Sequence, residues 1–259
     1  MTWLIFQANP WLFPTLMLIV LALAIEVPYR LGRPFSTRVS KQLDAFTVLQ
    51  AGLFTLASFV LGLSFAQASA RFDIRRDLVV KEANAIGTTW LRANQLPPPQ
   101  ANGFRRILTD YTAARLKAYG TPRDEQLYTV TIVRSSRDQD AMWHMASTAL
   151  RSHPSDLGLS LLVQTLNDTI DVSAEQLQAL TVHVPTIVVL LTLALVALGA
   201  VSLGLRFARD QTRPPILSAI YVVAYMFVIS MMIDYDRPQT GFVRVPLYPL
   251  TQQLSVMKP

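Results

Sequence analysis

The chain has 259 residues, of which 51% are hydrophobic and only 15% are charged, and its mean hydropathy is +0.33. Soluble globular domains carry about 25% charged residues, so this composition excludes an ordinary soluble protein and indicates a membrane protein. The sequence has no cysteine, which excludes disulfides, thiolate metal sites and cysteine nucleophiles.

Four apolar segments are long enough to cross the hydrocarbon core of a bilayer, which takes roughly 20 helical residues. They are residues 11–27, 49–70, 185–205 and 216–233. No Lys or Arg precedes the first segment, and its apolar stretch is too long for a signal peptide, so we expect it to be retained. The sequence predicts an all-α membrane protein with four transmembrane helices and a helical insert between the second and third. Its parts are residues 1–70, the insert at 71–184, residues 185–233 and a tail at 234–259.

The second span continues into the insert as one predicted helix, because no glycine or proline occurs between Leu63 and Ile86. In its membrane half, small residues recur at the four-residue spacing that allows transmembrane helices to pack closely. These helix-packing residues are Ser58, Gly62, Ala66 and Ala70. A second row on a neighbouring face is predicted to line a pore. This row is Thr55, Phe59, Leu63 and Gln67.

Each pore-row residue also has a simpler explanation. Phe59 and Leu63 could pack against neighbouring spans or lipid, and the Gln67 amide could hydrogen-bond across a helix interface.

The insert is predicted to be a helical bundle. Its first helix ends near residue 95, before three consecutive prolines, and a second covers residues 101–119. Residues 127–133 are rich in β-branched side chains and could form a strand, but a lone strand is unstable and no partner is visible. We therefore predict a third helix that continues to residue 153. A fourth covers residues 155–184, with Ser155 or Asp156 as its N-cap.

The net charge of +6 is not spread evenly. The insert is nearly balanced, with 13 basic and 12 acidic residues, so the excess positive charge flanks the spans, where headgroup anchors lie. We therefore expect the lipid bilayer and no nucleic acid as a partner. The positive charges on the two sides of the membrane are too similar in number to assign an orientation.

Several polar residues of the insert are candidates for a shared site. Glu82 and Asn84 fall on a helical stretch that is predicted to be half-buried, where polar groups must be hydrogen-bonded or exposed. One interpretation is a buried hydrogen-bond network, and the other is a charged vestibule below the pore. The candidate residues are Arg71, Glu82, Asn84, Arg115, Asn167 and Asp171.

The motif inventory favours no enzyme. The sequence contains no His-Glu-x-x-His motif, nucleophile elbow or Walker loop. Its three histidines, His144, His153 and His183, match no compact ligand spacing. We assign no catalytic residue, no cofactor and no metal site.

Several strings resemble known membrane protein families. Ser58-Phe59-Val60-Leu61-Gly62, followed by Arg71-Phe72, resembles the second-helix signature of the bestrophin anion channels. Two longer groups of strings resemble the bacterial bestrophin-like domain family of four-span membrane proteins. These are Arg71-Phe72-Asp73 with Glu82-Ala83-Asn84-Ala85-Ile86-Gly87, and Ile233-Asp234-Tyr235-Asp236-Arg237-Pro238 with Gly241. The second resemblance covers most of the chain.

The resemblance implies an assembly and a site. Bestrophins are pentamers whose second helices line a narrow apolar neck, with both termini and the helical domain in the cytosol. By analogy, Phe59 and Leu63 would lie in the neck, and the chain would be a multi-pass protein of the bacterial inner membrane. These two residues and Thr55, one turn away, do not all match the bulky residues typical of the bestrophin neck. The acidic calcium-binding cluster of animal members is not recognisable.

Two functions are consistent with the sequence. The first is a homo-oligomeric, bestrophin-like anion (chloride) channel with an apolar neck formed by the second span. The alternative is a non-conducting membrane scaffold or sensor whose helical insert docks a partner, because a bundle attached to four spans requires no pore.

Overall fold

The computed structural model describes residues 11–34, 43–120, 125–237 and 242–257, and in these residues it contains helices and no strand. This confirms the predicted all-α fold. The helices are α2 (Leu12–Gly32), α3 (Leu43–Arg92), the 3₁₀ turn η3 (Ala93–Gln95), α4 (Pro98–Gly120), α5 (Glu125–Ser152), α6 (Leu157–Thr181), α7 (Thr186–Arg209), α8 (Pro215–Asp236) and α9 (Tyr248–Met257).

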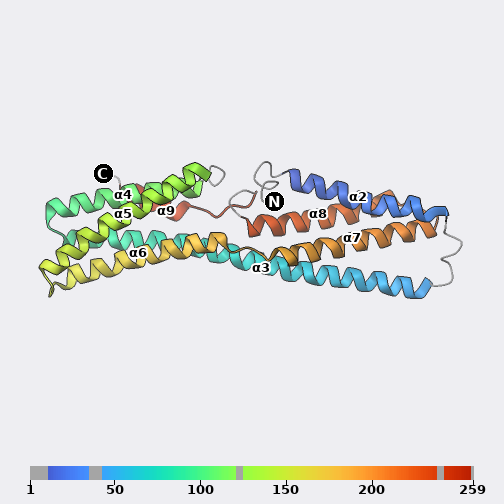
Figure 1. The fold of residues 1–259 in the computed structure, drawn as a ribbon, viewed down its shortest axis with the longest axis horizontal. Coiled ribbons are helices and arrows are strands. Elements are labelled where there is room, and N and C mark those ends of the chain that lie inside the picture. Colours follow the sequence, from blue (N-terminus) through green and yellow to red (C-terminus); the bar gives the residue numbers. More distant parts are fainter. Residues whose placement is uncertain (1–10, 35–42, 121–124, 238–241, 258–259) are drawn as a thin grey trace. The chain divides into compact units, whose positions relative to one another are not determined.

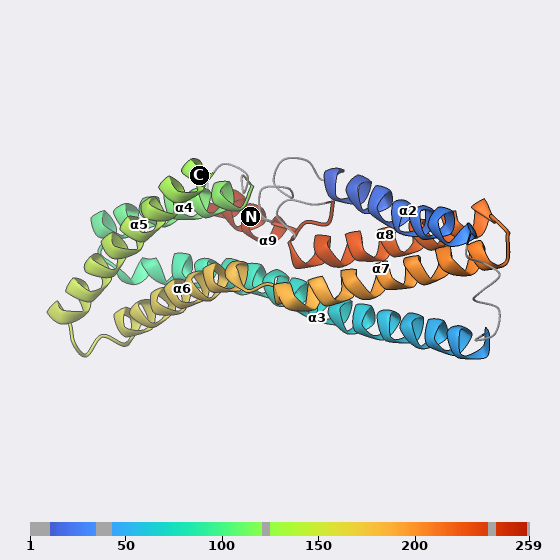
Figure 2. The same cartoon turned by 45° about the vertical axis from the view of Figure 1, so that its right-hand side comes forward.

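The chain forms two compact units, and α3 contributes to both. The membrane unit comprises Met1–Arg71 and His183–Val243, and the bundle unit comprises Phe72–Val182 and Arg244–Pro259. Figures 1 and 2 show α7 beside the first half of α3 and α6 beside its second half. Helix α2 packs against α7 and α8, and α5 packs against α4 and α6. Within the described residues, four helices are long and apolar enough to span a membrane, which confirms the four predicted spans.

Glycines allow very close helix packing in the membrane unit. A Cβ atom at Gly204 of α7 would collide with the backbone of Ile25 in α2. A Cβ atom at Gly199 would lie 2.7 Å from Tyr221 Oη and 2.8 Å from Phe54 Cε1. Lipid tails are as apolar as the helices, so association in a bilayer depends on van der Waals contact, which small residues permit. These glycines therefore bring the spans together.

The bundle helices begin and end where the sequence provides local signals. Helix α4 starts at Pro98. Proline is well tolerated at this position, because a backbone N–H in the first turn has no hydrogen-bond acceptor within the helix. The Asp156 side chain caps α6 by accepting a hydrogen bond from the Leu159 amide at 3.1 Å, as predicted. Helix α5 begins at Glu125, so the β-branched stretch is helical, which confirms that prediction.

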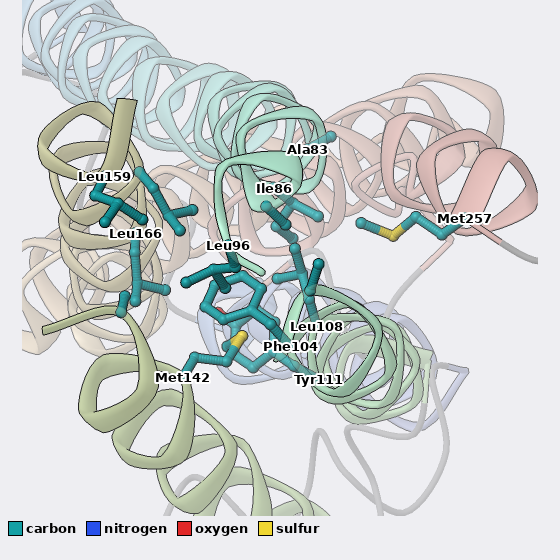
Figure 3. Packing of buried hydrophobic residues seen from close by; sticks show 14 of the residues in the cluster. Ala83, Ile86, Leu96, Phe104, Leu108, Tyr111, Met142, Leu159, Leu166 and Met257 are labelled. Carbon is teal, nitrogen blue, oxygen red and sulfur yellow. The ribbon is translucent and has the colours of Figure 1, made fainter. Parts of the chain in front are cut away.

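The bundle has its own apolar core, in which helices from distant parts of the chain meet. Figure 3 shows Ile86 of α3, Phe104 and Leu108 of α4, Met142 of α5 and Leu166 of α6 converging on it, and all five are fully buried. Burying each such side chain contributes about 1.5–3 kcal/mol to folding.

The C-terminal helix α9 packs on the bundle, with Leu250, Leu254 and Met257 buried. These residues belong to the predicted tail, in which no helix was expected. A Cβ atom at Gly87 of α3 would lie 2.8 Å from Gln253 Oε1, so this glycine provides space for the Gln253 side chain of α9.

Candidate pore helix and buried polar network

The four residues predicted to line a pore lie on one exposed face of α3. Phe59 and Leu63 are 62% and 50% exposed within the chain, and Thr55 and Gln67 are also exposed. The opposite face of this segment is buried in the membrane unit through Ala57, Leu61, Ser64 and Ala68. The spans of this chain therefore leave the predicted pore row uncovered.

The predicted packing row is also largely uncovered. Ser58, Gly62, Ala66 and Ala70 are exposed, and a Cβ atom at Gly62 would meet no atom within 4 Å. The Ser58 hydroxyl lies 3.4 Å from Tyr225 Oη of α8. Close packing within the chain is provided by Gly199 and Gly204 of α7, which the sequence analysis did not single out.

An ion pair is buried in the bundle. Glu82 of α3 accepts a hydrogen bond from Arg115 Nε of α4 at 2.6 Å, and the two side chains are 0% and 2% exposed. Tyr119 donates to Glu82 Oε2 at 3.1 Å, Tyr111 donates to Oε1 at 3.4 Å, and Arg115 also donates to the Tyr119 hydroxyl. Residues 111, 115 and 119 are four positions apart, so one face of α4 surrounds the carboxylate.

The charges in this cluster affect one another because water is excluded. Burial alone would lower the pKa of Arg115, but the nearby Glu82 carboxylate outweighs it, so the guanidinium pKa is raised and the cation is retained. Burial, followed by the charge of Glu82, raises the pKa of Tyr111 to about 12. The same two causes raise the pKa of Tyr119. The cluster therefore contains one anion, one cation and two neutral hydroxyl groups.

Side chains from α5 and α6 extend the network. Gln139 Nε2 donates to Tyr111 Oη at 3.3 Å and to Ser173 Oγ at 2.7 Å. Thr89 and Thr169 share a buried hydrogen bond of 3.0 Å between α3 and α6. Each of the helices α3, α4, α5 and α6 thus places hydrogen-bonded polar side chains inside the bundle.

The other predicted polar residues lie apart from this cluster. Asn84 is exposed, and Asn167 donates to Asp171 at 2.7 Å on the exposed side of α6. Arg71 is half-buried, and its Nη1 atom has no hydrogen-bond partner among the described residues. The structure therefore brings together Glu82 and Arg115, but not the rest of the set.

Sequence reasoning did not predict the roles of Arg75, Tyr119 and Gln139. Arg75 is buried and donates to the carbonyl oxygens of Ala179 and Val182 at 3.0 and 2.8 Å, which caps the C-terminal end of α6. The only available signal was the four-residue spacing on α4, which identifies a shared helix face but not the helix that it meets.

The two aspartates of the string 233–238 anchor backbone at one end of the membrane unit. Asp236 accepts a hydrogen bond from the Val184 amide at 2.9 Å and lies 3.5 Å from His183 Nδ1. Asp234 accepts from the amides of Phe242 and Val243 at 2.8 and 3.1 Å. These carboxylates therefore have structural partners. Within the described residues, no group of three or more His, Asp or Glu side chains is placed to hold a metal ion.

The fold and the uncovered span define a class, that of all-helical, multi-pass membrane proteins with a helical bundle attached to four spans. The chain belongs to the Bestrophin-like domain family, whose model matches residues 16–250.

Solved structures have the same fold. One crystal structure of a bacterial bestrophin homologue from Klebsiella pneumoniae, carrying a single mutation, aligns with a TM-score of 0.70 and 17% identity over 93% of this chain and 98% of that chain. Another mutant of this homologue gives a TM-score of 0.66 at 14% identity, covering 94% of this chain and 93% of that chain. No curated protein sequence matches the chain.

Proposed function

We propose that the chain is one subunit of an oligomeric anion channel, permeable to chloride, whose neck is lined by α3. Membership of the Bestrophin-like domain family and the fold shared with a bacterial bestrophin homologue support this function. The main support for this function is the uncovered row on α3. In this row, Phe59 is 62% exposed and Leu63 is 50% exposed. In a ring of subunits, five by analogy with bestrophins, this row would face the central axis.

The chemistry of the row suits a narrow apolar constriction. Rings of Phe59 and Leu63 would gate by dewetting, while weakly hydrated anions lose little hydration free energy on entering. Thr55 and Gln67 lie one turn outside the apolar pair on either side and would offer polar contacts there. The Thr55 hydroxyl donates to the Ala51 carbonyl oxygen at 2.9 Å, so it would have to leave this hydrogen bond to donate to a passing anion.

The buried network fits a structural role better than a vestibule. Glu82 and Arg115 are almost fully buried in the single chain, so neither side chain reaches a water-filled passage. We propose that the pair fixes α3 against α4, and that Arg71 and Asn84 are the polar residues of α3 available near the pore. By analogy with bestrophins, we place the bundle and both termini in the cytosol.

The first test is the number of subunits. Native mass spectrometry of the protein in detergent should give a closed ring, and a monomer or dimer would refute the neck. Protease protection at the turn before α4, around Pro97, would test the orientation.

Chloride flux in liposomes then tests the pore row. Phe59→Ala should change gating or leak, because it widens the apolar ring. Phe227→Ala on α8 is a matched control, since Phe227 is 60% exposed on another span. Equal effects of the two substitutions would contradict the proposal, and absence of flux from a correctly assembled ring would favour the scaffold or sensor.

A further inference from the structure

One end of the membrane unit carries a cluster of arginines that the channel does not require. The C-terminal ends of α2 and α7 and the start of α8 meet there, and the described residues at this end include five arginines and two acidic residues. These are Arg30, Arg33, Arg206, Arg209 and Arg213, with Glu26 and Asp210. Three candidate spans begin or end at this level, which is where a membrane-spanning unit would meet lipid headgroups.

Two arginines from different helical segments meet on a single carboxylate. Arg30 Nε of α2 lies 2.7 Å from Glu26 Oε1, and Arg213 Nη2, just before α8, lies 3.0 Å from Glu26 Oε2. The Arg213 guanidinium also lies over the Tyr29 ring, 6.0 Å from its centroid. One carboxylate with two guanidiniums keeps a net charge of +1, and the carboxylate holds both cations in place.

Both guanidiniums remain accessible. The Arg30 and Arg213 side chains are 72% and 62% exposed, and among the described residues each guanidinium uses only one nitrogen, on Glu26. A guanidinium presents five N–H donors in a planar fork that matches a phosphate group. Arg209, at the same end, is less accessible to a ligand. It pairs with Asp210 at 2.8 Å, and its side chain is only 16% exposed.

A clamp keeps the arginine-bearing segments together. Arg33 Nε donates to Gln211 Oε1 at 3.3 Å, and Gln211 Nε2 donates back to the Arg33 carbonyl oxygen at 3.4 Å. Gln211 has a φ of 51°, the only positive φ of a non-glycine residue among those described. Such a conformation is unfavourable for a residue with a side chain and persists only where surrounding contacts hold it. Arg30 and Arg213 are therefore brought together by a fixed turn.

We propose that Arg30 and Arg213, oriented by Glu26, bind the phosphate of an anionic phospholipid such as phosphatidylglycerol. Position favours a lipid over a free anion, since the site lies where the spans leave the hydrocarbon and Tyr29 adds an amphipathic ring of the kind found at membrane interfaces. The first turn of α8, which begins at Pro215, contains no acidic residue, so it adds no competing anion.

The test compares lipids of identical acyl chains bound to the full-length protein in detergent. In native mass spectrometry titrations, the wild type should retain phosphatidylglycerol in preference to phosphatidylcholine. The double variant Arg30→Lys, Arg213→Lys keeps both charges and can still pair with Glu26, but it lacks the guanidinium fork. Its affinity for phosphatidylglycerol should fall about tenfold, because a bidentate contact is lost at each position.

Arg134→Lys is the matched control, because Arg134 pairs with Asp110 at 3.8 Å on the surface of the bundle and is 61% exposed. It should leave lipid binding unchanged. Equal retention of the two lipids would overturn the proposal, as would wild-type affinity in the double lysine variant, which would show that charge alone is sufficient. If inorganic phosphate displaced the lipid at equal concentration, the site would bind a free anion and the proposal would also fail.

Discussion

The two units of the chain are stabilised by different means. In the membrane unit, α7 approaches α2 so closely that Gly204 has no space for a side chain. In the bundle, large apolar residues fill the core, and a fully buried ion pair between Glu82 and Arg115 lies among them. Water drives the bundle to bury apolar surface, and this gain offsets the desolvation of two charges. Lipid provides no such gain, so the membrane unit depends on backbone proximity.

The largest effect is expected from breaking the buried pair in the bundle. Glu82→Gln preserves the side-chain shape but leaves the Arg115 cation without an anion, which typically costs about 3–5 kcal/mol. Thermal unfolding in detergent should shift to a lower temperature, and amide exchange should accelerate in α4, α5 and α6. Asp110→Asn removes the exposed partner of Arg134 and should cost at most about 1 kcal/mol. If both substitutions lowered the free energy of unfolding equally, the buried pair would contribute no more to stability than the exposed one.

A smaller effect is expected from adding one methyl group to the membrane unit. In Gly204→Ala, the new Cβ atom would meet the backbone of Ile25, which cannot rotate away as a side chain can. Helices α2 and α7 would have to separate, at a cost of about 1–3 kcal/mol. Amide exchange should accelerate in α2 and α7 while the bundle stays protected. Unchanged exchange in α2 would disprove this account of the packing.

Alkaline pH should weaken the bundle through Tyr111. The folded-state pKa is raised to about 12 from the usual 10, so the buried phenol stays neutral while an unfolded chain ionises. Its contribution to stability is therefore complete below pH 10 and is lost as the pH rises through about 12. Unfolding followed by circular dichroism should show this loss, and Tyr111→Phe should reduce its pH dependence. Tyr248→Phe, which alters a tyrosine that is 68% exposed, should not.

The sequence predicted the parts of the fold that depend on local signals. Span length identified the four membrane helices, and the absence of glycine and proline after Leu63 indicated that α3 continues into the bundle. The Asp156 cap was also predictable, because its acceptor and donor are three residues apart.

Contacts between distant segments were beyond the same reasoning. Small residues at four-residue spacing on α3 predicted close packing, yet the closest approach occurs at Gly204 of α7, because spacing does not identify a partner. The contribution of Gln139 to the network and the packing of α9 on α4 depend on which helix faces join. That choice is made by the whole core, so no single segment encodes it.

The smallest effect on the single chain sharpens the comparison within the membrane unit. Gly62→Ala makes the same chemical change as Gly204→Ala, but the added methyl group meets no atom within 4 Å. The unfolding temperature of an isolated subunit should hardly change. If the row from Ser58 to Ala70 packs against a second copy, the methyl group should instead weaken the ring, which native mass spectrometry would detect as dissociated subunits. An intact ring with unchanged stability would show that the row faces lipid, and close packing between copies would then have to involve another face.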